Sequence, residues 1–182
     1  MRQDADLPDE IDITKAADVD WVKARADPAI WHEAAIAALA YVGDEHGFLT
    51  WLVQQPQMDR ATAGWILLAS PFREFLTGNR ASMFAMGIAI PELIEILTAL
   101  CERSDRVGFL NDRLGLEHQY EEMRQTCMAI IDNGELDRRV RAPTAIVGTP
   151  FAAPREDMPY SVHDGMLIST QFFKRTLPHL FD

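Results

Sequence analysis

The stretch DPAIWHEAAIAALAYVG, residues 27–43, contains the start, the buried face and the end of one helix. Asp27 is a favourable N-cap, and Pro28 suits the first helical position because its missing N–H costs nothing there. The apolar residues that follow recur every three or four positions: Ile30, Trp31, Ala34, Ala35, Ala38, Leu39 and Val42. Gly43 ends the pattern. This spacing predicts a helix with one face in a core.

Similar signals lie on both sides of this helix. Thr14 can cap a helix that continues to about Arg25. After Gly43, an apolar stripe ends before Pro56 and consists of Phe48, Leu49, Leu52 and Val53. Asp59 can cap a third helix, with Ala63, Ile66 and Leu67 facing inward. The sequence therefore predicts several short helices joined by tight polar turns.

The middle of the chain continues the helical pattern. Pro91 opens a longer helix, and residues 105–114 are expected to add a short one. The strongest helix covers residues 116–132, and its apolar seam consists of Leu116, Tyr120, Met123, Cys127 and Ile130. Asn133-Gly134 supplies the left-handed residue that ends it. Residues 81–90 are apolar without a clear period, and they fit either a buried helical turn or a connection that crosses the core.

The chain changes character after residue 134, where four prolines interrupt any long helix: Pro143, Pro150, Pro154 and Pro159. Residues 144–147 (TAIV) read as a short strand, and residues 160–169 read as a hairpin around Asp164-Gly165. Ser169 or Thr170 can cap a last helical turn. The apolar residues of this turn are Phe172, Phe173 and Leu177.

The predicted fold class is mainly α: a single helical domain of about six to eight helices, a loop-rich C-terminal segment and at most one short β-hairpin. We divide the chain into a flexible acidic leader (1–13), the helical domain (14–134) and a Pro-rich segment (135–182) packed on it. With 182 residues, 48% of them hydrophobic, the chain is long enough for one well-buried core.

Composition also limits the location and the ligands. No apolar run reaches the ~18 residues of a membrane span, and the N-terminus lacks the apolar core of a signal peptide. Cys101 and Cys127 are expected to be buried, reduced thiols. A cytoplasmic location follows. The net charge of −11, concentrated near the N-terminus, argues against nucleic acid and fits a basic protein partner.

Few residues are arranged for chemistry. The chain has no nucleophile elbow, paired-cysteine motif, zinc-protease motif or phosphate-binding glycine loop. His118, Glu121 and Glu122 lie at i, i+3 and i+4, so they can share a helix face and offer ligands to a metal. A solvated charged face explains them as well, and we expect no cofactor. His32 and His46 are the other pair that a turn at Gly43 could bring together, although helix capping and surface placement explain both residues as well.

The segment 31–68 resembles an uncharacterised family of bacterial helical domains of unknown function. The matching residues are Trp31-His32-Glu33-Ala34, Pro56, Asp59 and Thr62-Ala63. Met58 stands where that family usually has cysteine, and Gly64 where it usually has leucine. The resemblance implies a small helical module, often found in bacterial polymorphic gene neighbourhoods, with no assigned reaction.

Three functions remain open at this point. The first is a non-enzymatic protein-binding module, such as a bacterial immunity or antitoxin-like protein that neutralises a toxin. Its expected partner-binding residues are acidic groups at turns and in the leader: Asp44, Glu45, Asp59, Asp9, Glu10 and Asp12. The second is a small metal-dependent hydrolase that uses His118, Glu121 and Glu122. The third is a scaffold or regulatory subunit of a multi-protein assembly.

Overall fold

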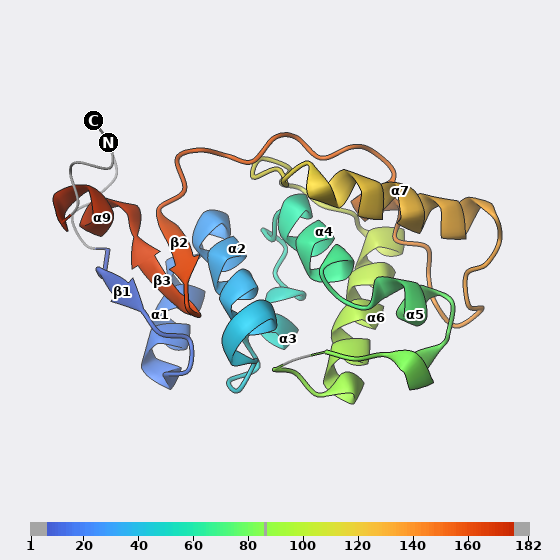
Figure 1. Cartoon of the computed structure of the whole chain (residues 1–182), viewed down its shortest axis with the longest axis horizontal. Coiled ribbons are helices and arrows are strands. Elements are labelled where there is room, and N and C mark those ends of the chain that lie inside the picture. Colours follow the sequence, from blue (N-terminus) through green and yellow to red (C-terminus); the bar gives the residue numbers. More distant parts are fainter. Residues whose placement is uncertain (1–6, 86, 177–182) are drawn as a thin grey trace.

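Helix α2 (Pro28–Ala37) lies between a small sheet and most of the other helices, as Figure 1 shows. The computed structural model describes residues 7–85 and 87–176. The elements that pack on α2 include α1 (Ala16–Arg25), α3 (Phe48–Leu52), α4 (Arg60–Leu68) and the strands β2 (Tyr160–His163) and β3 (Met166–Ser169). Most of α2 is buried on every side, which makes it the centre of the fold.

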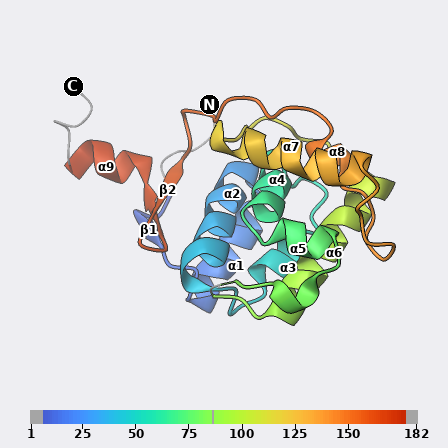
Figure 2. The same cartoon turned by 45° about the vertical axis from the view of Figure 1, so that its right-hand side comes forward.

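The helical body also contains α5 (Phe72–Leu76), α6 (Ile90–Arg106), α7 (Gln119–Asp132) and α8 (Thr144–Val147). A π-helical turn, η1 (Ala38–Val42), continues α2, and a 3-10 turn, η2 (Arg80–Ser82), follows α5. The sheet and α9 (Thr170–Thr176) lie at one end of the molecule in both views (Figures 1 and 2). The prediction of a mainly α-helical fold with one short hairpin is confirmed. Within the described ranges, no helix is long and apolar enough to cross a bilayer.

The predicted ends of α2 are confirmed. The Asp27 carboxylate accepts a hydrogen bond from the Ala29 backbone N–H at 2.9 Å, and Pro28 occupies the first turn. At the other end, Gly43 donates its N–H to the Ala38 carbonyl at 2.9 Å and adopts a φ of 87°. A Cβ at Gly43 would lie 2.3 Å from the Gly87 carbonyl oxygen. Glycine is therefore required here by both conformation and space.

Helix α4 is buried along its whole length. Asp59 caps it as predicted, accepting from the Ala61 N–H at 2.9 Å, and its second oxygen accepts from the Arg113 N–H at 2.8 Å. Arg60 is 5% exposed, and its guanidinium donates to the carbonyls of Ile146, Thr149 and Pro150. These bonds tie α4 to the segment after α8.

The sheet consists of β1 (Glu10–Ile11), β3 (Met166–Ser169) and β2, in that order and all antiparallel. Asp164 and Gly165 both have positive φ, as a two-residue hairpin turn requires, so the predicted hairpin is confirmed. The predicted flexible leader is wrong for its last residues. Strand β1 pairs with β3, and Ile11 and Ile13 are buried.

Two predicted elements are wrong. TAIV (144–147) is the helix α8 rather than a strand: its first turn follows Pro143, and the Ser104 hydroxyl accepts from the Ala145 N–H at 2.9 Å. The expected helix at 105–114 is also missing, because α6 ends at Arg106 and the chain then runs beside the start of α4. There the Arg60 N–H donates to the Asn111 carbonyl at 2.8 Å.

The helix predicted over 116–132 begins only at Gln119, so Leu116 is buried in the segment before α7. Within α7 the predicted seam is confirmed at Tyr120, Cys127 and Ile130 and wrong at Met123. Met123 is 39% exposed, whereas its neighbour Arg124 is buried and donates to the Val147 carbonyl at 2.6 Å. Cys127 packs in the core as expected, and both it and Cys101 are free, buried thiols. Burial raises the pKa of each thiol to about 12, so neither is a reactive thiolate.

The undecided stretch 81–90 contains the 3-10 turn η2, an irregular connection and the first residue of α6. Met83 and Ile88 are buried, while Phe84 is 76% exposed, so the connection touches the core without forming a helix across it. Residues 1–6 of the predicted leader, Met86 in this connection, and Leu177 of the predicted last helical turn lie outside the described residues.

Candidate functional site

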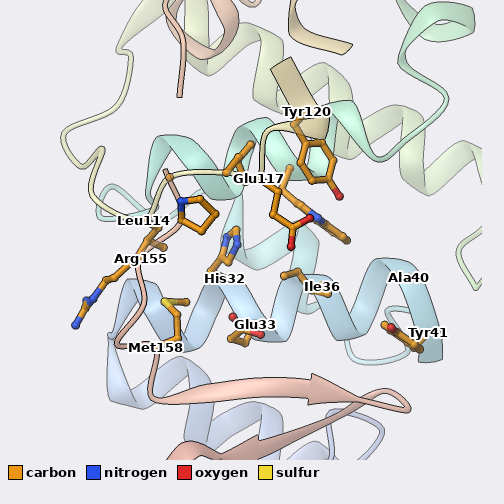
Figure 3. Close-up of a pocket in the computed structure, with 14 residues that line it drawn as sticks. His32, Glu33, Ile36, Ala40, Tyr41, Leu114, Glu117, Tyr120, Arg155 and Met158 are labelled. Atoms are coloured by element: carbon orange, nitrogen blue, oxygen red, sulfur yellow. The ribbon is translucent and has the colours of Figure 1, made fainter. Parts of the chain in front are cut away.

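A pocket of about 450 Å³ opens above α2, between that helix and α7. Its other walls come from the 114–117 segment before α7 and the 154–158 segment before β2, as Figure 3 shows. These two segments are joined by backbone hydrogen bonds from Leu116 to Ala152 and from Arg155 to Leu114. The polar and aromatic side chains that line the pocket are His32, Glu33, Tyr41, Trp65, Glu117, Tyr120 and Arg155.

His32 forms part of the pocket floor. It is 8% exposed, and its Nδ1 lies 3.0 Å from the Thr62 hydroxyl on α4. In Figure 3 its ring points from α2 toward Leu114 and Glu117. Burial lowers the pKa of His32 to about 4, so the imidazole is neutral near pH 7. A neutral imidazole leaves the pocket without positive charge from this residue.

Glu33 follows directly on α2 and is also buried. The backbone N–H of Val162 in β2 donates a hydrogen bond to its carboxylate. Within the described ranges, no salt bridge involves Glu33. Burial raises the pKa of Glu33 to about 7, an effect that the Val162 N–H partly opposes. Glu33 is therefore a carboxyl group that ionises near neutral pH beside a pocket.

The rim of the pocket carries more polar groups. Glu117 is exposed and accepts a hydrogen bond from the Gln119 amide at 2.7 Å. Tyr120, at the start of α7, is half-buried, and burial raises its pKa. Arg155 is held outward by a bidentate ion pair with Asp157. The rim therefore offers the Glu117 carboxylate, which forms no ion pair within the described residues, whereas Arg155 already has an ionic partner.

Two of the six acidic residues expected to bind a partner are internal caps. Asp44 accepts from the N–H groups of Phe48 and Leu49 at 2.6 and 2.9 Å, and burial raises its pKa. Asp59 is 1% exposed and caps α4. The prediction is corrected for these two residues, because a buried carboxylate that holds a helix start cannot also face a partner.

The other four acidic residues lie nearer the surface. Glu45, Asp9 and Glu10 are exposed, and Asp9 forms an ion pair of 2.7 Å with Arg175. Asp12 is half-buried and accepts from the Thr14 hydroxyl at 2.6 Å, which lowers the pKa of Asp12. The turn that carries Glu45 lies beside the end of the leader, since His46 Nε2 is 2.8 Å from the Thr14 carbonyl.

The structure does not support the predicted metal ligands. Glu121 accepts two hydrogen bonds of 2.7 Å from Arg124, and this pairing lowers its pKa to about 2. His118 and Glu122 are exposed. In the described part of the chain, no three His, Cys, Asp or Glu residues are grouped closely enough to hold a metal. His32 and His46 have separate partners, Thr62 and Thr14, rather than each other.

Sequence analysis missed the pocket, although one signal pointed to it. The residues around His32-Glu33 are apolar on all sides of the helix, and such a helix is buried all round. A polar pair in that context must be buried and must find partners. The positions of Glu117 and Arg155 at the pocket could not be predicted. Both residues lie on loops far from His32 in the sequence, and only the folded path of those loops brings them to the pocket.

No known protein family, curated protein or solved structure matches this chain.

Proposed function

We propose that this protein is a non-enzymatic binding module for a basic protein partner, of the kind represented by bacterial immunity and antitoxin proteins. Its location in the cytoplasm is part of the same proposal. The supporting observation is a single surface that combines a carboxylate-lined pocket with exposed aromatic residues. We call this surface the Tyr41 face: it comprises the pocket, η1 and the neighbouring hollow that contains Phe84.

The Tyr41 face is continuous. Ala40 of η1 lines the acidic pocket on one side and a second, apolar hollow of about 440 Å³ on the other. Tyr41 is 55% exposed and Phe84 is 76% exposed. Exposed aromatic residues beside pockets are typical of protein-binding surfaces, where they supply most of the binding energy. π-helical turns such as η1 also occur frequently at functional sites.

Charge favours a basic partner. The chain carries a net charge of −11, and Glu33 and Glu117 line the pocket of the Tyr41 face. A basic protein would be attracted over a distance of about one Debye length and then docked by short-range contacts. This fits neutralisation of a toxin that acts on nucleic acid or another anionic target, because such toxins need basic surfaces.

The metal-dependent hydrolase has no comparable support. Glu121, one of its three residues, is neutralised by Arg124, and His118 starts a helix at the surface. A scaffold would use the same Tyr41 face and differs from an immunity protein only in its biological effect. Neutralisation of a toxin is therefore the decisive activity to measure.

The experiment pairs the protein with the toxic product of a neighbouring gene in its native genome. Co-expression should restore growth, and the purified complex should weaken as salt is raised. Replacing Tyr41 and Phe84 together with alanine should abolish protection, whereas Leu110→Ala should not, although Leu110 is 80% exposed. Leu110 lines a different groove, so it is a matched control. The proposal would be overturned if the wild type gave no protection, or if Leu110→Ala abolished protection while the Tyr41 and Phe84 double variant kept it.

A further inference from the structure

The pocket of the Tyr41 face contains a carboxyl group whose environment is unusual. Glu33 is 9% exposed, has a backbone N–H as its hydrogen-bond donor, and forms no salt bridge within the described ranges. A buried carboxylate is normally paired with a cation. Glu33 lines a pocket that is open to a ligand, so the missing cation can come from outside the protein.

The walls of the pocket suit a flat cation. Trp65, Tyr120 and Tyr41 supply aromatic rings, and Glu117 supplies a second carboxylate at the mouth. Figure 3 shows Glu117, Tyr120 and Ile36 on the same side of the pocket as His32. A guanidinium group is planar, stacks on aromatic faces and binds carboxylates with two parallel hydrogen bonds. An ammonium group is compact and strongly hydrated, so it fits such a site less well.

Two arginines of the protein itself lie against aromatic rings and near oxygen atoms. The Arg60 guanidinium carbon lies 4.3 Å from the centre of the Phe151 ring, and its Nε lies 2.9 Å from an Asp112 carboxylate oxygen. Arg103 likewise lies 4.9 Å from the Phe109 ring centre and donates to nearby backbone carbonyls. Arg60, which is buried, and Arg103, which is half-buried, thus each lie beside an aromatic ring and an oxygen acceptor.

We infer that the pocket between α2 and α7 receives an arginine side chain of the basic partner, between the carboxylates of Glu33 and Glu117. This inference rests on the proposed function, and it names the group that the Tyr41 face recognises. Arg155 of this chain also lines the pocket. It does not take the place of the partner's arginine, because its guanidinium is paired with Asp157.

Binding of the arginine is linked to protons. A cation beside Glu33 favours its ionised form, so a proton is released when the arginine enters. The titratable groups that line the pocket together with Glu33 are His32 on α2, Tyr41 on η1, Glu117 before α7, Tyr120 on α7 and Arg155 before β2. The Val162 N–H on β2 donates to Glu33 itself. His32 is neutral and Arg155 is paired, so neither supplies the opposite charge. Affinity should therefore rise with pH through about 7.

The test uses the full chain and a small probe, N-acetyl-arginine N-methylamide, followed by the NMR signal of the Trp65 indole N–H. The probe should shift this signal, and the matching lysine probe should bind several-fold more weakly. Glu117→Gln should weaken arginine binding about tenfold, because a charge-assisted hydrogen bond is lost. Glu122→Gln is the control, since Glu122 is exposed on α7 and does not line the pocket.

Glu33→Gln separates a direct role from a folding effect. Its amide oxygen can still accept from the Val162 N–H, so thermal unfolding should show a folded protein while the pH dependence of probe binding disappears. Equal binding of both probes, no shift with the arginine probe, or binding unchanged in Glu117→Gln would overturn the inference. If those results occur while Tyr41 and Phe84 are still required for neutralisation, the proposed function stands and only the arginine pocket is wrong.

Discussion

His32 and Glu33 are consecutive residues of α2, and their side chains bind elements on different sides of that helix. His32 reaches Thr62 on α4, with 3.0 Å between Nδ1 and Oγ1, while Glu33 accepts a hydrogen bond from the Val162 N–H on β2. Adjacent helical residues point about 100° apart, which makes this division possible. The pair therefore holds α2 between the helical body and the sheet.

Burial shifts the two pKa values in opposite directions, to about 4 for His32 and about 7 for Glu33. The folded protein binds the Glu33 proton more tightly than the unfolded chain does, so this residue makes stability fall as pH rises. The folded protein binds the His32 proton less tightly, so His32 makes stability rise with pH. The two slopes oppose each other where their windows overlap, between about pH 4.5 and 6.5.

Glu33→Gln should stabilise the protein at alkaline pH. The raised pKa of Glu33 corresponds to a penalty of roughly 3 kcal/mol that is absent below about pH 4.5 and complete above about pH 7. Glutamine removes the charge and keeps an acceptor for the Val162 N–H. Urea unfolding should show a clear gain over wild type near pH 8 and almost none near pH 4. A gain that is independent of pH would contradict the pKa assignment.

His32→Gln should change how stability depends on pH in the acidic range. The lowered pKa of His32 contributes a loss of stability as pH falls from about 6.5 to 4, because the unfolded chain takes up a proton that the folded protein excludes. In the wild type this loss offsets the gain due to Glu33. The variant lacks the contribution of His32, so only Glu33 determines the slope. Its stability should therefore increase steadily as pH falls from about 7 to 4.5. Equilibrium unfolding of both single variants and the double variant measures the two slopes separately.

Local signals predicted some ends of elements well and missed others: the expected cap Thr14 does not cap α1, whose N-cap is Lys15. Asp27 and Asp59 cap α2 and α4, and Asp164-Gly165 forms the hairpin turn, because each signal depends on residues adjacent in sequence. TAIV (144–147) was misread because β-branched residues favour strands only when a partner strand is available. Here the segment packs instead on α4, α6 and α7 as a helical turn.

Nonlocal effects explain what the sequence could not show. Met123 is the better core residue by hydrophobicity, yet the neighbouring Arg124 is buried because the Val147 carbonyl and Glu121 satisfy its donors. The candidate site was not predicted: the apolar residues around His32-Glu33 indicate only that this pair is buried, and Glu117 comes from the other half of the chain. A pocket formed by loops depends on their path, which no local pattern encodes.

Gly43→Ala should destabilise the protein more than an equivalent change at an open glycine. Gly43 has a φ of 87°, and an added methyl group would lie 2.3 Å from the Gly87 carbonyl oxygen, so the variant must shift backbone. We expect a loss of roughly 2–3 kcal/mol by urea unfolding. Gly134→Ala is the control, because its φ is 70° with nothing within 4 Å, and it should lose about 1 kcal/mol. Equal losses would show that the close approach is unimportant.

Arg60→Leu should be among the most destabilising single changes. It removes donors from the carbonyls of Ile146, Thr149 and Pro150 and leaves them unpaired beneath the surface, at a cost of roughly 3–5 kcal/mol. Arg139→Leu is the comparison, since the Arg139 side chain is 67% exposed and its ion pair with Asp137 should contribute little. Thermal unfolding of the two variants gives the contrast directly, and similar melting temperatures would contradict it.

Asp44 and Glu45 are adjacent acidic residues with different expected roles. Asp44 accepts from two N–H groups at the start of α3, so Asp44→Ala should cost about 1 kcal/mol of stability. Glu45 is exposed beside the end of the leader, so Glu45→Lys should leave the melting temperature nearly unchanged. With a basic partner, Glu45→Lys should slow association and reduce its dependence on salt, because rim charges act mainly on the encounter rate. Stopped-flow association at low and high salt measures this effect. If the association rate with Glu45→Lys matches that of wild type at low salt, the partner approaches from another side, and the acidic turn contributes only to solubility.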